Sequence, residues 1–227
     1  MGPGVTLAPD AVRTMFDRIA PVYDAMNRVM TLGLDLRWRR LTASAVVQHG
    51  DRVLDAACGT GDLAVADVRA GAARVTGLDF SEQMLVRAKK KAPAIEWLQG
   101  DMLALPFADG TFDAYTVGFG VRNVSELALA LSEARRVLRP GGRIAILEIT
   151  QPRGVLRPFF TLWFDKLVPL LGCVLPGGSA YGYLPASVRR FPGAEELARQ
   201  MHDAGFADVR FRLLGGSIVA LHTGVAA

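Results

Sequence analysis

A short stretch with two acids and two glycines, DAACGTGD from Asp55 to Asp62, carries the strongest chemical signal in the sequence. Gly59 and Gly61 permit a tight turn and a close approach of a ligand to the backbone. Together with Ala64 they also fit the pattern of a dinucleotide-binding loop. A pyrophosphate bound there would face two carboxylates, however, so the pattern favours a cationic ligand. The competing interpretation is that Asp62 only caps a helix.

Three predicted strands in succession end in an acid, namely Asp55, Asp79 and Asp101. An acid at the position of Asp79, 18 residues after Gly61, can accept hydrogen bonds from both hydroxyls of a ribose. A carboxylate at Asp101 is placed to meet the amino group of an adenine. One such acid alone would often be a turn cap. Three at one edge of a sheet predict a nucleoside that carries a positive charge and no phosphate, which describes S-adenosylmethionine.

A sheet is needed to bring these strand ends together. The predicted strands are 52–57, 74–79, 95–99, 112–118 and 143–149, and helices 62–70, 81–91 and 125–138 lie between them. The last of these helices is stopped by proline and glycine at 139–142. Strict alternation of this kind predicts a parallel sheet with helices on both faces and a ligand at the carboxyl ends of the strands.

The C-terminal part of the chain breaks the alternation. Helix 194–204 is followed by strands 206–213 and 216–223, which only Leu214 and Gly215 separate, so we expect an antiparallel hairpin. An antiparallel last strand predicts an α/β fold of the Rossmann-like class I S-adenosylmethionine-dependent methyltransferase type. The predicted parts are an N-terminal helical cap (1–50), a cofactor-binding core (51–150), an insertion covering the site (151–192) and a C-terminal helix and hairpin (193–227).

Length and composition limit the class of protein. With 227 residues and 51% hydrophobic content, the chain can form one domain with a sizeable core. Cys58 and Cys173 give neither metal-ligand spacing nor a disulfide framework, so we expect no metal site and a reducing, cytoplasmic location. We also expect no secretion signal. The net charge of +4 comes from scattered basic residues without interleaved aromatics, which predicts no nucleic-acid partner.

Motifs spread along the chain resemble those of one family. The two most specific are Tyr23-Asp24-x-Met26-Asn27, with Trp38 downstream, and FGVRN at 119–123. Others are CGTGD at 58–62, ALPF at 104–107, RVLRPGG at 136–142, LE at 147–148, YGYLPAS at 181–187 and VALH at 219–222. From residue 15 to residue 226 the chain resembles the ubiquinone/menaquinone biosynthesis C-methyltransferases, of the demethylmenaquinone methyltransferase kind.

The resemblance implies which residues hold the cofactor. Together with the glycine loop and the strand end described above, the predicted cofactor-binding set is Gly59, Thr60, Gly61, Asp79, Phe80, Asp101, Met102 and Gly118. Two positions depart from the family pattern, because Met102 is commonly a small residue and Gly118 commonly a serine, so one hydroxyl contact is missing. The family usually has serine and histidine where this chain has Thr31 and Asp35, which leaves the exact quinol open.

The implied reaction moves a methyl group from the sulfonium to a ring carbon of a prenylated hydroquinone. The phenolate form of such a ring pushes charge onto the neighbouring carbon. Arg122 is the candidate for stabilising that phenolate, and Asn123 for orienting a hydroxyl or a water. The competing interpretation of Arg122 is a structural ion pair with Asp113 or Glu126.

Proton handling and substrate class remain open. Tyr183 is a candidate for moving a proton, and His222 is a weaker one. The first alternative to quinol methylation is methylation of another lipid or aromatic small molecule. The second is a nucleotide-binding, dehydrogenase-like domain without methyltransferase activity.

The longest apolar stretch, 159–175, is interrupted by Asp165, Lys166 and Pro169 and is too short to span a bilayer. Its side chains are candidates for lining a pocket for a polyprenyl tail or for meeting lipid, beside basic residues that suit phosphate headgroups. The competing interpretation is ordinary packing onto the sheet. The resemblance implies a prenylated quinol as substrate, and peripheral membrane contact and a homodimer stay open.

Overall fold

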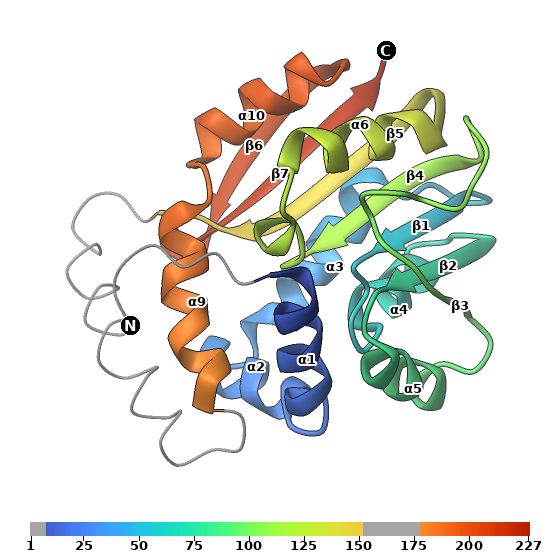
Figure 1. The fold of residues 1–227 in the computed structure, drawn as a ribbon. Helices are drawn as coiled ribbons and strands as arrows, with labels where there is room; N and C mark the ends of the chain where they lie inside the picture. Colours follow the sequence, from blue (N-terminus) through green and yellow to red (C-terminus); the bar gives the residue numbers. More distant parts are fainter. Residues whose placement is uncertain (1–7, 152–177) are drawn as a thin grey trace.

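The computed structural model describes residues 8–151 and 178–227, which form one sheet flanked by helices (Figure 1). The strands are β1 (Arg52–Ala56), β2 (Arg74–Asp79), β3 (Glu96–Gln99), β4 (Phe112–Gly118), β5 (Leu138–Ile149), β6 (Phe206–Leu214) and β7 (Val219–Ala226). The helices are α1 (Pro9–Ile19), α2 (Tyr23–Thr31), α3 (Leu34–Val46), α4 (Asp62–Arg69), α5 (Glu82–Lys91), the 3-10 turn η1 (Val121–Asn123), α6 (Leu127–Val137), α9 (Gly178–Arg190) and α10 (Ala194–Asp203).

The seven strands have the order β3-β2-β1-β4-β5-β7-β6. The pairings from β3 to β5 are parallel, and β7 is antiparallel to both β5 and β6. Successive strands are added outward on one side of β1 up to β3 and then on its other side from β4 onward, so the strand order reverses between β1 and β4. Ligands of open α/β sheets bind at such a switch point. The predicted fold class, an α/β sheet of the class I methyltransferase type with an antiparallel last strand, is confirmed.

Alternation along the central strands buries both faces of the sheet. In β1, Val53 packs on the side covered by α3 and α4, whereas its neighbour Leu54 packs on the side covered by α6 and α10. Both side chains are completely buried. This explains why β1 reads as a continuous apolar run, as expected of a strand covered on both faces.

Among the element boundaries, the starts of two strands differ most from the sequence prediction, and β7 also ends later, at Ala226 rather than at residue 223. Strand β5 begins at Leu138 rather than at residue 143, and its pairing with β4 shifts register between Phe112 and Ala114. Strand β7 begins at Val219 rather than at residue 216, because Gly215, Gly216 and Ser217 all have positive φ and form a longer turn. The predicted hairpin is therefore present, but its turn is not the two-residue one.

The N-terminal helices divide into two groups. Helix α3 joins α4 against the sheet, where Trp38 and Ala43 lie in the core. Helices α1 and α2 instead form a separate apolar cluster with Met84 of α5, which Tyr183 of α9 also contacts. They lie beyond the carboxyl ends of the strands, next to α9 (Figure 1). The predicted division into four parts stays a prediction, and most of the expected insertion, residues 152–177, lies outside the described residues.

Candidate cofactor and active site

A cavity opens at the carboxyl ends of β1, β2 and β4 and encloses about 800 Å³, including the part that is open to solvent. Its lining includes many of the predicted site residues, namely Gly59, Asp79, Phe80, Asp101, Met102, Gly118 and Asn123. Thr60, Gly61, Arg122 and Tyr183 are not among the lining residues. Sequence reasoning did not assign the apolar wall from α1 and α5, which comprises Val12, Phe16 and Met84.

Asp79 connects the end of β2 to the glycine loop. Its Oδ2 accepts a hydrogen bond from the backbone N–H of Gly59 (2.7 Å), and its Oδ1 accepts one from the N–H of Ser81 (2.9 Å). Burial raises the pKa of Asp79 to about 6, although these backbone hydrogen bonds act in the opposite direction. The carboxylate is thus fixed in the cavity wall, where an acceptor for ribose hydroxyls is expected.

The glycine loop needs a residue without a side chain at position 61, because Trp97 of β3, the strand beyond β2, packs against it. A Cβ at Gly61 would lie 2.4 Å from the Trp97 ring, and Gly61 has a φ of +84°. Ala57 and Phe119, on the two loops that face the cavity, also have positive φ although they are not glycines. Backbone strain of this kind is typical of functional sites.

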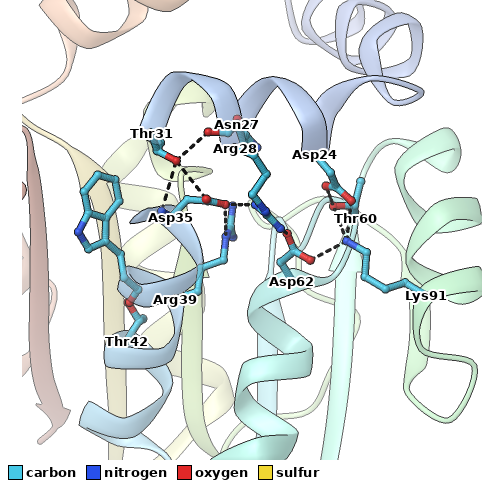
Figure 2. A network of polar contacts seen from close by, with 11 residues as sticks. Asp24, Asn27, Arg28, Thr31, Asp35, Arg39, Thr42, Thr60, Asp62 and Lys91 are labelled. Atoms are coloured by element: carbon cyan, nitrogen blue, oxygen red, sulfur yellow. Dashed lines mark hydrogen bonds and ion pairs between the residues drawn. The ribbon is translucent and has the colours of Figure 1, made fainter. Parts of the chain in front are cut away.

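Asp62 is neutralised by two cations from other helices (Figure 2). Arg28 of α2 binds its Oδ2 at 2.6 Å, and Lys91 of α5 binds its Oδ1 at 2.6 Å. Burial alone would raise the pKa of Asp62, but these hydrogen bonds outweigh burial and the pKa is lowered. The prediction that Asp62 helps to attract a cationic ligand is therefore corrected, because Asp62 holds the helices together.

The same network ties the glycine loop to the N-terminal helices. The Thr60 hydroxyl donates to Asp24 of α2 (2.5 Å), and Lys91 binds the other oxygen of Asp24 at 2.7 Å. Asp35, at the family's usual histidine position, is buried and accepts hydrogen bonds from Arg28 and Thr31 (Figure 2). These two departures from the family pattern thus lie in an ionic network and not in the cavity lining.

Asp55, the acid at the end of β1, is completely buried and does not line the cavity. Neither of its carboxylate oxygens has a hydrogen-bond partner. Burial raises its pKa to about 8, although Arg39 and the backbone of Ala64 act in the opposite direction. The expected cluster of three ligand-facing acids therefore reduces to two, Asp79 and Asp101.

The raised pKa of Asp55 predicts a pH-dependent stability. The folded protein keeps the proton that the unfolded chain, with a pKa near 3.9, releases, so stability should fall as pH rises between about pH 4 and pH 8. Asp55→Asn cannot ionise at this position. As pH rises through that range, the free energy of unfolding of the variant should therefore increase relative to that of the wild type by up to about 1.4 kcal/mol per pH unit. Chemical denaturation of both proteins at several pH values measures this difference, and a constant difference contradicts it.

Arg122 forms a buried ion pair with Glu148 of β5. Its Nη1 lies 2.7 Å from Glu148 Oε1 and donates to the carbonyl of Phe119 at 2.7 Å. Burial disfavours the charged guanidinium, but Glu148 outweighs it and the pKa of Arg122 is raised. The ion-pair partners expected from the sequence, Asp113 and Glu126, are wrong. Asp113 instead binds Arg139 at 2.5 Å.

The other two predicted catalytic residues are Asn123, which follows Arg122 in η1, and Tyr183, which interacts electrostatically with Arg122. Asn123 lines the cavity, and its buried Oδ1 has no hydrogen-bond partner. Tyr183 of α9 is half-buried beside the apolar cluster of α1 and α2, and burial raises its pKa although Arg122 and Arg190 act in the opposite direction. The structure thus places an unpaired, buried amide oxygen on a residue of the cavity wall, and a half-buried phenol on α9 that interacts electrostatically with Arg122.

His222 lies in β7, where it is 1% exposed and does not line the cavity. Its Nε2 lies 2.8 Å from the carbonyl of Ala194, which only accepts, so Nε2 carries the proton. Burial lowers its pKa. The weaker prediction that His222 handles a proton in the reaction is corrected, because this side chain packs under α10.

Comparison with known proteins decides between the remaining interpretations. The profile described as the ubiE/COQ5 methyltransferase family matches residues 5–226. The chain belongs to this family. The predicted enzyme class, a methyltransferase with S-adenosylmethionine as methyl donor, is therefore confirmed, and the dehydrogenase-like alternative is wrong.

Two curated relatives cover nearly the whole chain. A protein of Thermus thermophilus named demethylmenaquinone methyltransferase is 44% identical over 218 residues, which cover 92% of this chain and 99% of that protein. A protein of Roseobacter denitrificans named ubiquinone/menaquinone biosynthesis C-methyltransferase UbiE is 40% identical over 223 residues, covering 94% and 89% of the two chains.

Solved structures share the fold at lower identity. A possible histamine N-methyltransferase from Thermotoga maritima superposes with a TM-score of 0.64 at 20% identity and covers 94% of this chain and 100% of that one. The [4+2]-cyclase SpnF superposes with a TM-score of 0.74 at 18% identity, covering 99% and 98%. A protein titled as a cyclase shares the architecture with methyltransferases, so the fold alone does not identify the reaction.

Proposed function

We propose that this methyltransferase adds a methyl group to a ring carbon of a prenylated hydroquinone, in the biosynthesis of menaquinone or ubiquinone. The names of the two curated relatives support this substrate class. The observation that carries the proposal is one cavity lined both by Asp79 and Asp101 and by residues of the segment after β4, namely Gly118, Phe119, Gly120 and Asn123. We assign the two acids to the nucleoside of the cofactor, and the segment after β4 to the acceptor ring.

Within this site the protein's task is mainly to position and desolvate the acceptor. Much of the rate enhancement in such a transfer comes from holding the carbon in line with the methyl group in a dry pocket. The apolar wall formed by Val12, Phe16 and Met84 supplies such surroundings. S-adenosylmethionine supplies the methyl group and the leaving thioether when it is bound.

Charge stabilisation is assigned to Arg122. A phenol with a pKa near 10 becomes a good carbon nucleophile as its phenolate, and a fixed cation favours that form. Glu148 holds the guanidinium by its Nη1 and also accepts a hydrogen bond from the Arg122 backbone N–H (3.3 Å). Arg122 is therefore proposed to act on the acceptor oxygen from a fixed position beside the cavity.

Asn123 and Tyr183 are proposed to handle the remaining polar contacts. The unpartnered Oδ1 of Asn123 can accept a hydrogen bond from a hydroxyl of the acceptor. The raised pKa of Tyr183 keeps its hydroxyl protonated at neutral pH, so it suits donation rather than removal of a proton.

A tail-binding or membrane-facing role of the apolar stretch 159–175 remains a proposal, and that stretch lies outside the described residues. Among the helices of the described ranges, none is long and apolar enough to cross a membrane. We likewise propose a cytoplasmic location, weak contact with the inner membrane face, a homodimer and no nucleic-acid partner.

The tail proposal predicts a preference among acceptors. A long-tailed quinol should have a kcat/KM several-fold above that of its tail-less analogue, because roughly 0.8 kcal/mol is available per buried CH₂ group. Co-sedimentation with anionic liposomes should be weak and should decrease as salt is added. Equal kcat/KM values for the two acceptors, together with no co-sedimentation at low salt, would contradict the proposal and indicate that the stretch 159–175 only packs in the core.

A competition between acceptor classes tests the proposed function. Purified protein, labelled S-adenosylmethionine and a mixture of a demethylmenaquinol, a demethylated benzoquinol and a simple catechol are incubated together. The proposal expects label in one or both prenylated quinols. Label in the catechol alone favours the alternative, methylation of another aromatic small molecule, and contradicts the proposal.

A further inference from the structure

Arg39 of α3 is a buried cation without a strong partner. The residue is 5% exposed, and its Nε has no hydrogen-bond partner. The nearest carboxylate oxygen of Asp35 lies 3.9 Å from that Nε. The guanidinium also lies 5.2 Å from the centre of the Phe119 ring. Buried charges are normally paired and hydrogen-bonded, so this arrangement is incomplete.

The anions around Arg39 are already engaged. Asp35 accepts hydrogen bonds from Arg28 and Thr31, and Asp62 binds Arg28 and Lys91 (Figure 2). Asp55 interacts with Arg39 electrostatically, but burial raises its pKa to about 8, so it is largely neutral at pH 7. Within the described ranges, no carboxylate therefore makes a close ion pair with Arg39.

The guanidinium lies beside residues of the cavity wall, although Arg39 itself is not among the lining residues. A Cβ built on Gly118 would lie 3.2 Å from Arg39 Nη1, and Gly118 itself lines the cavity next to Phe119. The absence of a side chain at residue 118 thus leaves the path between Nη1 and the cavity open. Asp79 and Asp101, where the nucleoside is expected, line the same cavity.

We propose that Arg39 binds the carboxylate of the amino-acid end of the cofactor. The inference rests on the use of S-adenosylmethionine and adds a residue that the sequence motifs did not indicate. Asp79, Gly59 and Gly118 line one cavity, so with the ribose at Asp79 an amino-acid end directed toward Gly118 would come within reach of Arg39. The carboxylate of the cofactor would accept hydrogen bonds from the guanidinium and neutralise the positive charge of Arg39, for which the protein supplies no close carboxylate.

Calorimetry with two neutral-sulfur probes tests this contact. S-adenosylhomocysteine carries the amino-acid end, whereas 5′-methylthioadenosine keeps the nucleoside and lacks the carboxylate. Arg39→Gln should weaken binding of S-adenosylhomocysteine about 10- to 100-fold, as expected for a lost charge-assisted hydrogen bond. Binding of 5′-methylthioadenosine should change by less than about threefold.

A further variant guards against a general effect of losing an arginine from α3. Arg40→Gln removes an exposed arginine from the next position of the helix and should change neither dissociation constant. Thermal unfolding of Arg39→Gln shows whether the variant is folded at the temperature of the titration.

The outcomes separate this inference from the proposed function. If Arg39→Gln weakens both probes equally, or neither, Arg39 only ties α3 to the sheet and the inference is wrong. If the wild-type protein binds neither probe, the cofactor assignment itself fails. If both probes bind and only the quinol reaction is absent, the proposed substrate class fails while the role of Arg39 stands.

Discussion

Replacing Arg122 by alanine should lower turnover at least about 100-fold, as expected when one partner of a developing negative charge is removed. The dissociation constant of S-adenosylhomocysteine should stay within about threefold of the wild-type value, because Arg122 does not line the cavity that Asp79 and Asp101 border. Steady-state kinetics and calorimetry on the same preparation measure the two effects.

The buried ion pair requires a stability control. Arg122→Ala leaves Glu148, which is 1% exposed, without its cation, and breaking such a pair costs about 3–5 kcal/mol. Thermal unfolding of the variant must therefore be recorded at the assay temperature. Arg139→Ala removes a more exposed arginine from its pair with Asp113 and should leave turnover unchanged. If cofactor affinity collapses together with turnover in Arg122→Ala, the role of Arg122 is structural.

Asp79→Ala should weaken cofactor binding about 10- to 150-fold, since a charged acceptor of hydroxyl hydrogen bonds contributes about 1.5–3 kcal/mol. The loss includes any loosening of the glycine loop, because Asp79 also accepts the N–H of Gly59. Asp79→Asn retains the shape and one acceptor oxygen and should lose less. An unchanged dissociation constant in Asp79→Ala refutes the assignment of this residue to the ribose.

The same residue predicts the pH dependence of binding. In the free protein the pKa of Asp79 is about 6. Hydroxyl donors favour the carboxylate, so the cofactor lowers this pKa and competes with the proton. Affinity for S-adenosylhomocysteine should therefore be constant well above pH 6 and fall by up to about tenfold per pH unit below it. Asp79→Asn should remove most of this dependence.

The sheet was predictable because its signals are local. The apolar runs of β1 and β4, and the glycines and prolines between elements, are read within short windows of sequence. The predicted start of β7 was wrong because the positive φ of Ser217 extends the turn. A glycine in the sequence indicates that a positive φ is accessible, whereas a serine does not. Local patterns likewise did not show that α3 packs against the sheet rather than over the site.

The site residues that lie at the ends of strands could be predicted from the sequence. Asp79 and Asp101 follow from topology alone, since parallel strands bring their carboxyl ends to one edge. The pairing of Arg122 with Glu148 and the approach of Arg39 to Gly118 depend on contacts between distant segments. The position of Asp55 shows the converse, because an acid at a strand end can be buried completely and face no ligand.

The central claim, transfer of a methyl group to carbon, is tested most directly by locating the methyl group in the product. Purified protein is incubated with S-adenosylmethionine carrying a ¹³C-labelled methyl group and with a demethylmenaquinol, and the product is examined by mass spectrometry and NMR. The account predicts a single labelled methyl group whose carbon is bonded to a ring carbon. A labelled methyl group on a phenolic oxygen, or cofactor binding without any labelled quinol, would contradict it.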